Sequence, residues 1–127
     1  MSPVDSNKST QLNGALPADI WRARRFIDEN SVDEISLLAV AKAVNISPTH
    51  LSEKFKKVTG VRYVDYVARV RFEKARELLH NGDMRVSEIA FAAGFQSLSQ
   101  FNRTFKKLSG YSPRAYRAVW QESKNQN

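Results

Sequence analysis

The sequence F-K-K-V-T-G at residues 55–60 recurs as F-K-K-L-S-G at residues 105–110, 50 positions further along the chain. A serine stands eight residues before each phenylalanine, and a tyrosine follows six residues after each glycine. Over the 20 aligned pairs from 47/97 to 66/116, six pairs are identical. A repeat of this period indicates a duplicated supersecondary element. Two copies are too few for a solenoid, so we expect two small modules in one chain.

Start and stop signals for helices surround both copies. Ser47-Pro48 combines a capping hydroxyl with a proline at the first helical position, which predicts a helix from there to about Val58. In the second copy Ser97 caps a helix to about Leu108, with Gln100 in the reciprocal capping position. Glycines 60 and 110 follow as left-handed helix ends. Shorter helices are predicted before each, from Leu37 to about Val44 after the cap Ser36 and from Val86 to Ala93.

The segment from about Arg62 to His80 has no glycine or proline and predicts one long helix between the copies. Apolar residues form two patches on it, one with Tyr63, Tyr66, Val67 and Val70 and one with Ala68, Phe72, Ala75 and Leu79. A helix with two apolar faces packs against two bodies, so we interpret it as the connector. On its remaining face, Asp65–Arg69 and Arg69–Glu73 have the spacing of helical ion pairs.

Helices are also predicted from Pro17 to Asn30 and from Ser112-Pro113 to about Trp120, and no stretch has a strand pattern. The predicted fold is therefore all-α, with about seven helices. Two helix-turn-helix subdomains, at about 36–60 and 85–110, are joined by the linker helix at about 62–80. We expect residues 1–16 to be a flexible leader and residues 119–127 to be a frayed tail.

The charge of the chain is uneven. The formal net charge is +7, with a net of −2 over residues 1–53 and +9 over residues 54–127. Such a field favours a polyanionic partner, either nucleic acid or an anionic membrane, although solubility alone would also account for it. A membrane surface fits poorly, because the lysines flank helix ends and do not line one long amphipathic face.

Several function classes are disfavoured by composition. The chain has no cysteine, which excludes disulfides, thiolate metal sites and cysteine nucleophiles. No nucleophile, metal cluster or phosphate loop indicates an enzyme, and we expect no cofactor and no small-molecule ligand. No apolar run reaches membrane-span length and no signal-peptide core is present, which favours the cytoplasm. Of the two histidines, His80 is most simply a cation near a helix end.

In each module a short helix, a tight turn and a capped second helix follow one another, with cations at the far end of the second helix. In the helix-turn-helix arrangement the second helix enters the major groove of DNA. The 19-residue connector would be about 28 Å long, which can separate two recognition helices by roughly the 34 Å of one DNA turn. One chain would then read two segments on one face of the duplex.

The residues also resemble the AraC/XylS family of transcription regulators over roughly residues 17–118. The matching stretches are K-A-R-E-L-L (74–79), V-S-E-I-A (86–90), G-F (94–95), F-N-R-T-F-K-K (101–107) and G-Y-S-P-R-A-Y-R (110–117). Phe72 is a mild departure, since the family favours an aliphatic residue there. The resemblance implies a seven-helix DNA-binding domain that binds an asymmetric site as a monomer. It also implies contact with RNA polymerase during activation.

The resemblance places base contacts on both second helices, at Thr49, Ser52, Glu53, Leu98, Ser99, Gln100 and Arg103. Arg103 has the chemistry to pair with guanine, Gln100 with adenine, and Leu98 to pack on a thymine methyl. The alternative for Arg103 is a solvated surface arginine. Glu53 would be repelled by phosphates unless it accepts from a cytosine amino group or is neutralised by a neighbour such as Lys57.

Phosphate contacts are expected from cations, polar side chains and helix starts on both modules. The candidates are Ser36, Ser47, His50, Lys54, Lys56, Lys57, Ser97, Asn102, Lys106 and Lys107. For His50, partial burial against the first helix is the alternative. Leu51, Phe55, Phe101 and Phe105 are expected in the core.

The sequence therefore predicts a sequence-specific DNA-binding regulator, with double-stranded DNA and RNA polymerase as partners. The rival is a non-specific nucleic-acid-binding or protein-binding adaptor module, in which the basic faces dock an acidic partner. A sequence preference in DNA binding separates the two.

Overall fold

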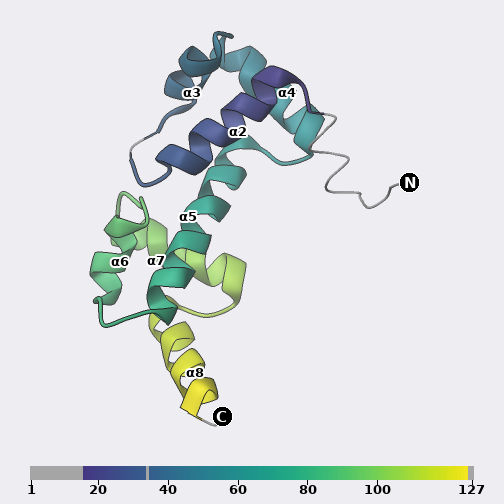
Figure 1. The fold of residues 1–127 in the computed structure, drawn as a ribbon. Coiled ribbons are helices and arrows are strands. Elements are labelled where there is room, and N and C mark those ends of the chain that lie inside the picture. The colour runs from purple at the N-terminus through teal and green to yellow at the C-terminus, as the bar shows by residue number, and fades with distance from the viewer. Residues whose placement is uncertain (1–15, 34, 126–127) are drawn as a thin grey trace. The chain divides into compact units, whose positions relative to one another are not determined.

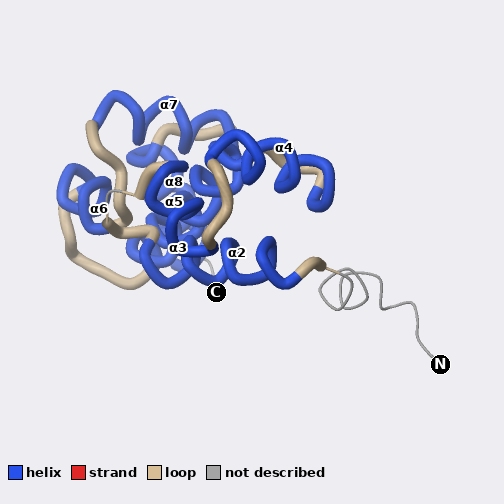
Figure 2. The backbone as a smooth tube through the Cα atoms, turned by 90° about the horizontal axis from the view of Figure 1, so that it is seen from above, coloured by secondary structure: helices blue, strands red, loops and turns tan. Residues whose placement is uncertain are grey.

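The computed structural model describes residues 16–33 and 35–125. The described residues contain seven helices and no strand, which confirms the predicted all-α fold (Figures 1 and 2). In chain order the helices are α2 (Ala18–Asn30), α3 (Leu37–Val44), α4 (Pro48–Thr59), α5 (Tyr63–His80), α6 (Val86–Ala92), α7 (Leu98–Ser109) and α8 (Pro113–Asn125). The flexible leader predicted for residues 1–16 lies, except for Leu16, outside the described residues, as do residues 126 and 127 of the predicted tail.

Backbone contacts divide the described residues into two compact units. The first unit comprises residues 16–30 and 35–63, and the second comprises residues 31–33 and 64–125. The boundary falls at the start of α5, so nearly all of that helix belongs to the second unit.

In the first unit α2 packs against α3 and α4. Apolar residues at helical spacing on α2 bury one face, and the short α3 and the amphipathic α4 bury theirs against it. The buried residues are Ile20, Ala23, Ile27, Val40, Ala41, Val44, Leu51 and Phe55. Between α3 and α4 the chain turns at Asn45, whose φ of 64° lies in the left-handed region that asparagine tolerates. The Ile46 amide donates to the Ala41 carbonyl at 3.0 Å and closes the turn.

The second unit places the same kind of helix pair, α6 and α7, beside α5 and α8. Phe105 of α7 lies among three aromatic rings, with ring centroids 4.8 Å from Phe72, 5.7 Å from Phe101 and 5.2 Å from Tyr116. The core is completed by buried apolar residues of α5, of α6 and of the turn after α6. They are Ala75, Leu79, Ile89, Ala90, Ala93 and Phe95. Both copies of the repeated phenylalanine, Phe55 and Phe105, are fully buried, which confirms that they belong to the cores.

A buried arginine, which the sequence patterns did not single out, holds the segment after α2 in the second unit. The Arg71 Nε donates to the Ser31 carbonyl and its Nη2 to the Asp33 carbonyl, both at 2.9 Å. Arg71 follows the buried Tyr63 and Val67 at intervals of four residues, so it lies on the same face of α5. A cation on this otherwise apolar face was the sequence signal that could have indicated its burial.

The helix limits follow the sequence signals closely, with one clear difference at the end of the chain. Gly60 and Gly110 end their helices at φ of 81° and 85°, as predicted. The last helix, however, does not stop near Trp120 but continues to Asn125, because no glycine or proline interrupts residues 121–125 and a helix already nucleated by packing propagates easily. On α5, Glu73 pairs with Arg76 and not with Arg69.

His80 is not the simple exposed cation that its position at the end of α5 suggested. Its ring is partly buried and stacks on Trp120 at a centroid distance of 3.8 Å, and its Nε2 lies 2.8 Å from the Tyr116 hydroxyl. Desolvation, with a smaller contribution from Arg76, lowers the pKa of His80 below its ordinary value of 6.5. The folded chain therefore favours the neutral ring, and helix α8 covers it.

Candidate nucleic-acid interface

The outward face of α4 carries most of the polar side chains predicted for the first module. Leu51 and Phe55 are fully buried, and residues two apart on a helix point about 200° apart. Glu53, midway between them, therefore points away from the core. Thr49, His50, Ser52, Glu53, Lys56 and Lys57 are all exposed. The exposure of His50 argues against its burial on α2.

Helix α7 repeats this arrangement in the second unit. Phe101 and Phe105 are fully buried, and Arg103 between them points outward. Leu98, Ser99, Asn102, Arg103, Lys106 and Lys107 are exposed. Leu98 is 42% exposed, so an apolar side chain stands in water at the start of the helix. Exposing an apolar side chain to water costs free energy. That free energy is recovered when the side chain contacts an apolar partner such as a thymine methyl.

Two of the predicted base readers on α7 already have hydrogen-bond partners. The Arg103 Nη1 donates to the Ser99 hydroxyl at 3.3 Å, one helical turn earlier, which orients the guanidinium along the exposed face. The Gln100 side chain accepts from the Gln96 amide at 3.2 Å. The sequence predicted that the Gln100 side chain would accept from the Ser97 amide. It accepts from the amide of the preceding residue, Gln96, instead. Five residues, 93–97, separate α6 from α7, whereas three residues, 45–47, separate α3 from α4.

Lys54, whose counterpart in the second copy is Thr104, differs from the lysines of the repeat because an acid within the first unit already binds it. Its Nζ lies 2.9 Å from the Asp19 carboxylate of α2, and both side chains are partly buried. The hydrogen bond from Lys54 lowers the pKa of Asp19 and outweighs the opposing effect of desolvation. A lysine held in this way has less charge to offer a phosphate, whereas Lys56, Lys57, Lys106 and Lys107 extend into solvent.

The capping serines are where the sequence placed them. The hydroxyls of Ser36, Ser47 and Ser97 accept from the amides of Ala39, His50 and Gln100 at 3.0–3.1 Å. Among the first three residues of α4, Pro48 has no amide hydrogen and the His50 amide donates to Ser47, so the Thr49 amide is left without a described acceptor. Helix α7 has two such amides, those of Leu98 and Ser99. The second helix start thus offers more N–H groups to an anion.

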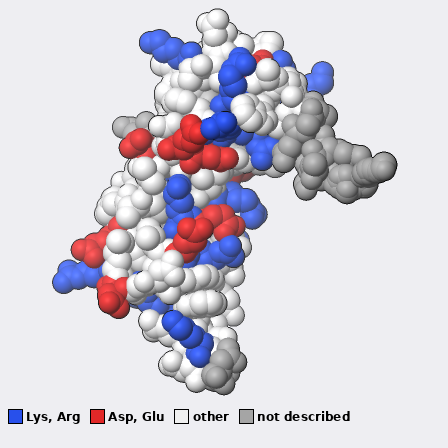
Figure 3. Space-filling model, in the orientation of Figure 1, with Lys and Arg blue, Asp and Glu red and all other residues white. Residues whose placement is uncertain are grey.

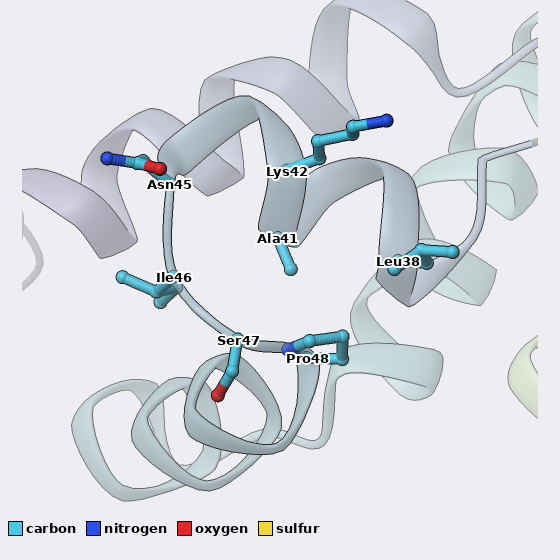
Figure 4. A pocket seen from close by; sticks show the side chains of 7 residues that line it. All are labelled: Leu38, Ala41, Lys42, Asn45, Ile46, Ser47 and Pro48. Atoms are coloured by element: carbon cyan, nitrogen blue, oxygen red, sulfur yellow. The ribbon is translucent and has the colours of Figure 1, made fainter.

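A hollow of about 470 Å³ lies beside the start of α4. It is lined by seven residues of α3, of the turn and of the start of α4: Leu38, Ala41, Lys42, Asn45, Ile46, Ser47 and Pro48. Figure 4 shows Ala41 between Leu38 and Ile46, pointing toward the chain at Ser47 and Pro48, while Lys42 extends outward. No acidic side chain is among the lining residues. The start of α4 is therefore open to approach from the α3 side.

The two outward faces differ in charge. On α4, Glu53, Lys56 and Lys57 sum to +1 once Lys54 is set against Asp19, whereas Arg103, Lys106 and Lys107 on α7 sum to +3. Figure 3 shows acidic and basic side chains interspersed on the face in view. Of the two outward faces, that of α7 therefore offers a polyanion the greater positive charge.

Two capped helix pairs, each with a polar and cationic second helix, define a protein with two helix-turn-helix units. A family model described as "Helix-turn-helix domain" matches residues 40–118. The chain belongs to the AraC/XylS family of bacterial DNA-binding transcription regulators. The predicted family is thereby confirmed.

Individual relatives support the assignment to this family. The regulatory protein PocR of Salmonella typhimurium is 35% identical over 124 residues, which are 96% of this chain and 41% of PocR. The chain thus spans less than half the length of that relative. The C-terminal domain of AraT, a response regulator from Geobacillus stearothermophilus, has a TM-score of 0.79 at 33% identity, covering 83% of this chain and 88% of that domain. The DNA-binding domain of AdpA, solved with a target DNA, shares the fold, with a TM-score of 0.81 at 23% identity over 87% of this chain and all of that domain.

Among the described helices, none is both long and apolar enough to cross a membrane.

Proposed function

We propose that this chain is a sequence-specific DNA-binding module that reads two adjacent major-groove segments of an asymmetric promoter site. The observation that carries the proposal is the pair of equivalent outward faces on α4 and α7. Each has polar side chains near the helix start and two exposed lysines near its end. In a helix-turn-helix unit the first group is placed for bases and the second for phosphates. Residues 17–118 form the proposed DNA-binding domain.

In this proposal the base readers are Thr49, Ser52, Glu53, Leu98, Ser99, Gln100 and Arg103. The phosphate contacts come from Ser36, Ser47, His50, Lys56, Lys57, Ser97, Asn102, Lys106 and Lys107, with a weaker contribution from Lys54. To bind a phosphate, Lys54 must break its ion pair with Asp19. The free energy gained from the phosphate contact is then offset by the loss of that ion pair.

Two further features complete the proposal. The chain acts as a monomer, because it carries both units that a symmetric dimer would otherwise supply from two chains. It acts as an activator that contacts RNA polymerase, as the family resemblance implies. Reporter transcription with and without the chain, from a promoter that carries its selected site, tests this second feature. Lower transcription in the presence of the chain would reassign it as a repressor.

The experiment that tests DNA recognition is selection of bound sequences from a random DNA pool, followed by affinity measurements on the selected site and on a scrambled site at several salt concentrations. Specific recognition predicts an affinity ratio of at least about 10³ between the two. Both affinities should fall steeply with salt because lysines release counterions from phosphates. Salt dependence without any preference would instead support the adaptor or non-specific module.

A further inference from the structure

The centres of the two outward faces carry opposite charges. Glu53 on α4 and Arg103 on α7 are 50 positions apart and occupy equivalent places in the repeat. Each is flanked two residues before and after by fully buried apolar residues, Leu51 and Phe55 in one case and Phe101 and Phe105 in the other. Each side chain therefore points directly away from its own core. Whatever approaches the middle of these helices meets a carboxylate in one unit and a guanidinium in the other.

Among the described residues, no ion pair neutralises the Glu53 carboxylate. The sequence left open a pairing with Lys57, one turn later, but the described ion pairs do not include one, and Glu53 stays exposed. The adjacent Lys54 is bound to Asp19 of α2. An acid at this place weakens the attraction of α4 for phosphates. It is compatible with tight DNA binding only if a donor on the DNA meets it.

The base edges of the major groove offer few such donors. A carboxylate can only accept hydrogen bonds. Guanine presents acceptors there and thymine an acceptor and a methyl group, whereas cytosine and adenine each present an amino group. In adenine the amino group lies beside the N7 acceptor, which repels the second carboxylate oxygen. Cytosine has a C–H group at that place, so cytosine is the best partner.

We infer that Glu53 is a specificity-determining residue that accepts from a cytosine amino group in the first half-site. This inference rests on the proposed function, in which α4 enters the major groove. Arg103 has the chemistry for guanine at the equivalent place, so we expect different bases at the equivalent positions of the two half-sites.

The test uses the selected DNA site and the Glu53→Gln variant, which keeps the size of the side chain and removes its charge. Each base pair of both half-sites is replaced in turn, and the dissociation constants of the two proteins are compared. For the original chain, replacing the critical cytosine should weaken binding on the order of tenfold or more. Glu53→Gln should transfer that preference to adenine, whose N6 and N7 suit a glutamine amide. The preference in the second half-site should stay unchanged.

Lys57→Gln is the matched control, because it lies on the same exposed face of α4 and also changes one charge. It should weaken binding to all sequences by a similar factor and leave the cytosine preference intact. The inference is overturned if Glu53→Gln keeps the cytosine preference, or if it merely tightens binding to every sequence alike. If the original chain selects no sequence at all, the proposed function fails as well. Selection at the second half-site alone would refute only the role of Glu53.

Discussion

Replacing Gly94 with alanine should destabilise the second unit far more than the same change at Gly110. Both glycines have a positive φ, 104° and 85°, so both substitutions carry the cost of a left-handed alanine, about 1–2 kcal/mol. Their surroundings differ. A Cβ at Gly110 would meet nothing within 4 Å, whereas one at Gly94 would lie 2.2 Å from the Ser31 carbonyl oxygen and 3.0 Å from the Arg71 Nε.

The contact at Gly94 is costly because the oxygen it displaces already has a partner. The Ser31 carbonyl accepts from the buried Arg71 at 2.9 Å, and a hydrogen bond from a charged group contributes about 1.5–3 kcal/mol. Adding this to the backbone cost and subtracting about 0.4–1 kcal/mol for the stiffer unfolded chain gives a loss of about 3 kcal/mol. For Gly110→Ala the same sum without the hydrogen bond gives about 1 kcal/mol.

Urea unfolding of the two variants measures this difference. In a Trp21→Phe background, Trp120 is the remaining tryptophan and its fluorescence reports the second unit, where it stacks on His80. A steady slope with urea and a lower midpoint identify a true loss of stability. If Gly94→Ala and Gly110→Ala agree within about 0.5 kcal/mol, the close packing of Ser31, Gly94 and Arg71 does not contribute as described.

Three further outcomes are expected. Arg103→Ala should lower affinity for the selected site by about 1–3 kcal/mol and relax discrimination at one base pair; equal losses on selected and random DNA would contradict base reading. Lys107→Ala should weaken binding to all sequences and reduce the salt slope by about 1, while Lys54→Ala should change the slope less, because Asp19 already compensates that charge. The pKa of His80 is lowered on folding, so the unfolded chain takes up the proton first as the pH falls. Urea unfolding should therefore show stability that is complete above about pH 6.5 and declines below it, and His80→Gln should lose that part of the decline.

Most of the secondary structure was predictable because its signals are local. Ser47-Pro48, Ser97 and the two helix-ending glycines determine helix limits through bonds that reach only three or four residues, so one module's sequence suffices to place them. The end of the last helix was not predictable in this way. Its final residues are polar and exposed, and the helix continues through them because its beginning is packed against the core and nothing in 121–125 interrupts it.

The candidate interface was predictable to a similar degree. Exposure of Glu53 and Arg103 follows from the alternation of buried and outward residues on a helix, and the structure agrees. The ion-pair partners of individual charged side chains could not be predicted from that alternation. Lys54 directly precedes the repeated F-K-K and has the same charge as its lysines, yet an acid 35 residues away binds it. No periodicity within α4 can reveal a partner on α2.

The sequence alone determined that this chain is a duplicated helical module with basic second helices, because helix caps, apolar spacing and an internal repeat are written in neighbouring residues. The tertiary structure alone decided which polar groups are already satisfied. It binds Lys54 to Asp19, buries Arg71 against two carbonyls and stacks His80 on Trp120. Among the described residues, it gives Glu53 no ion-pair partner. These outcomes depend on distances between residues far apart in the chain, and charge interactions are set by such distances and by burial.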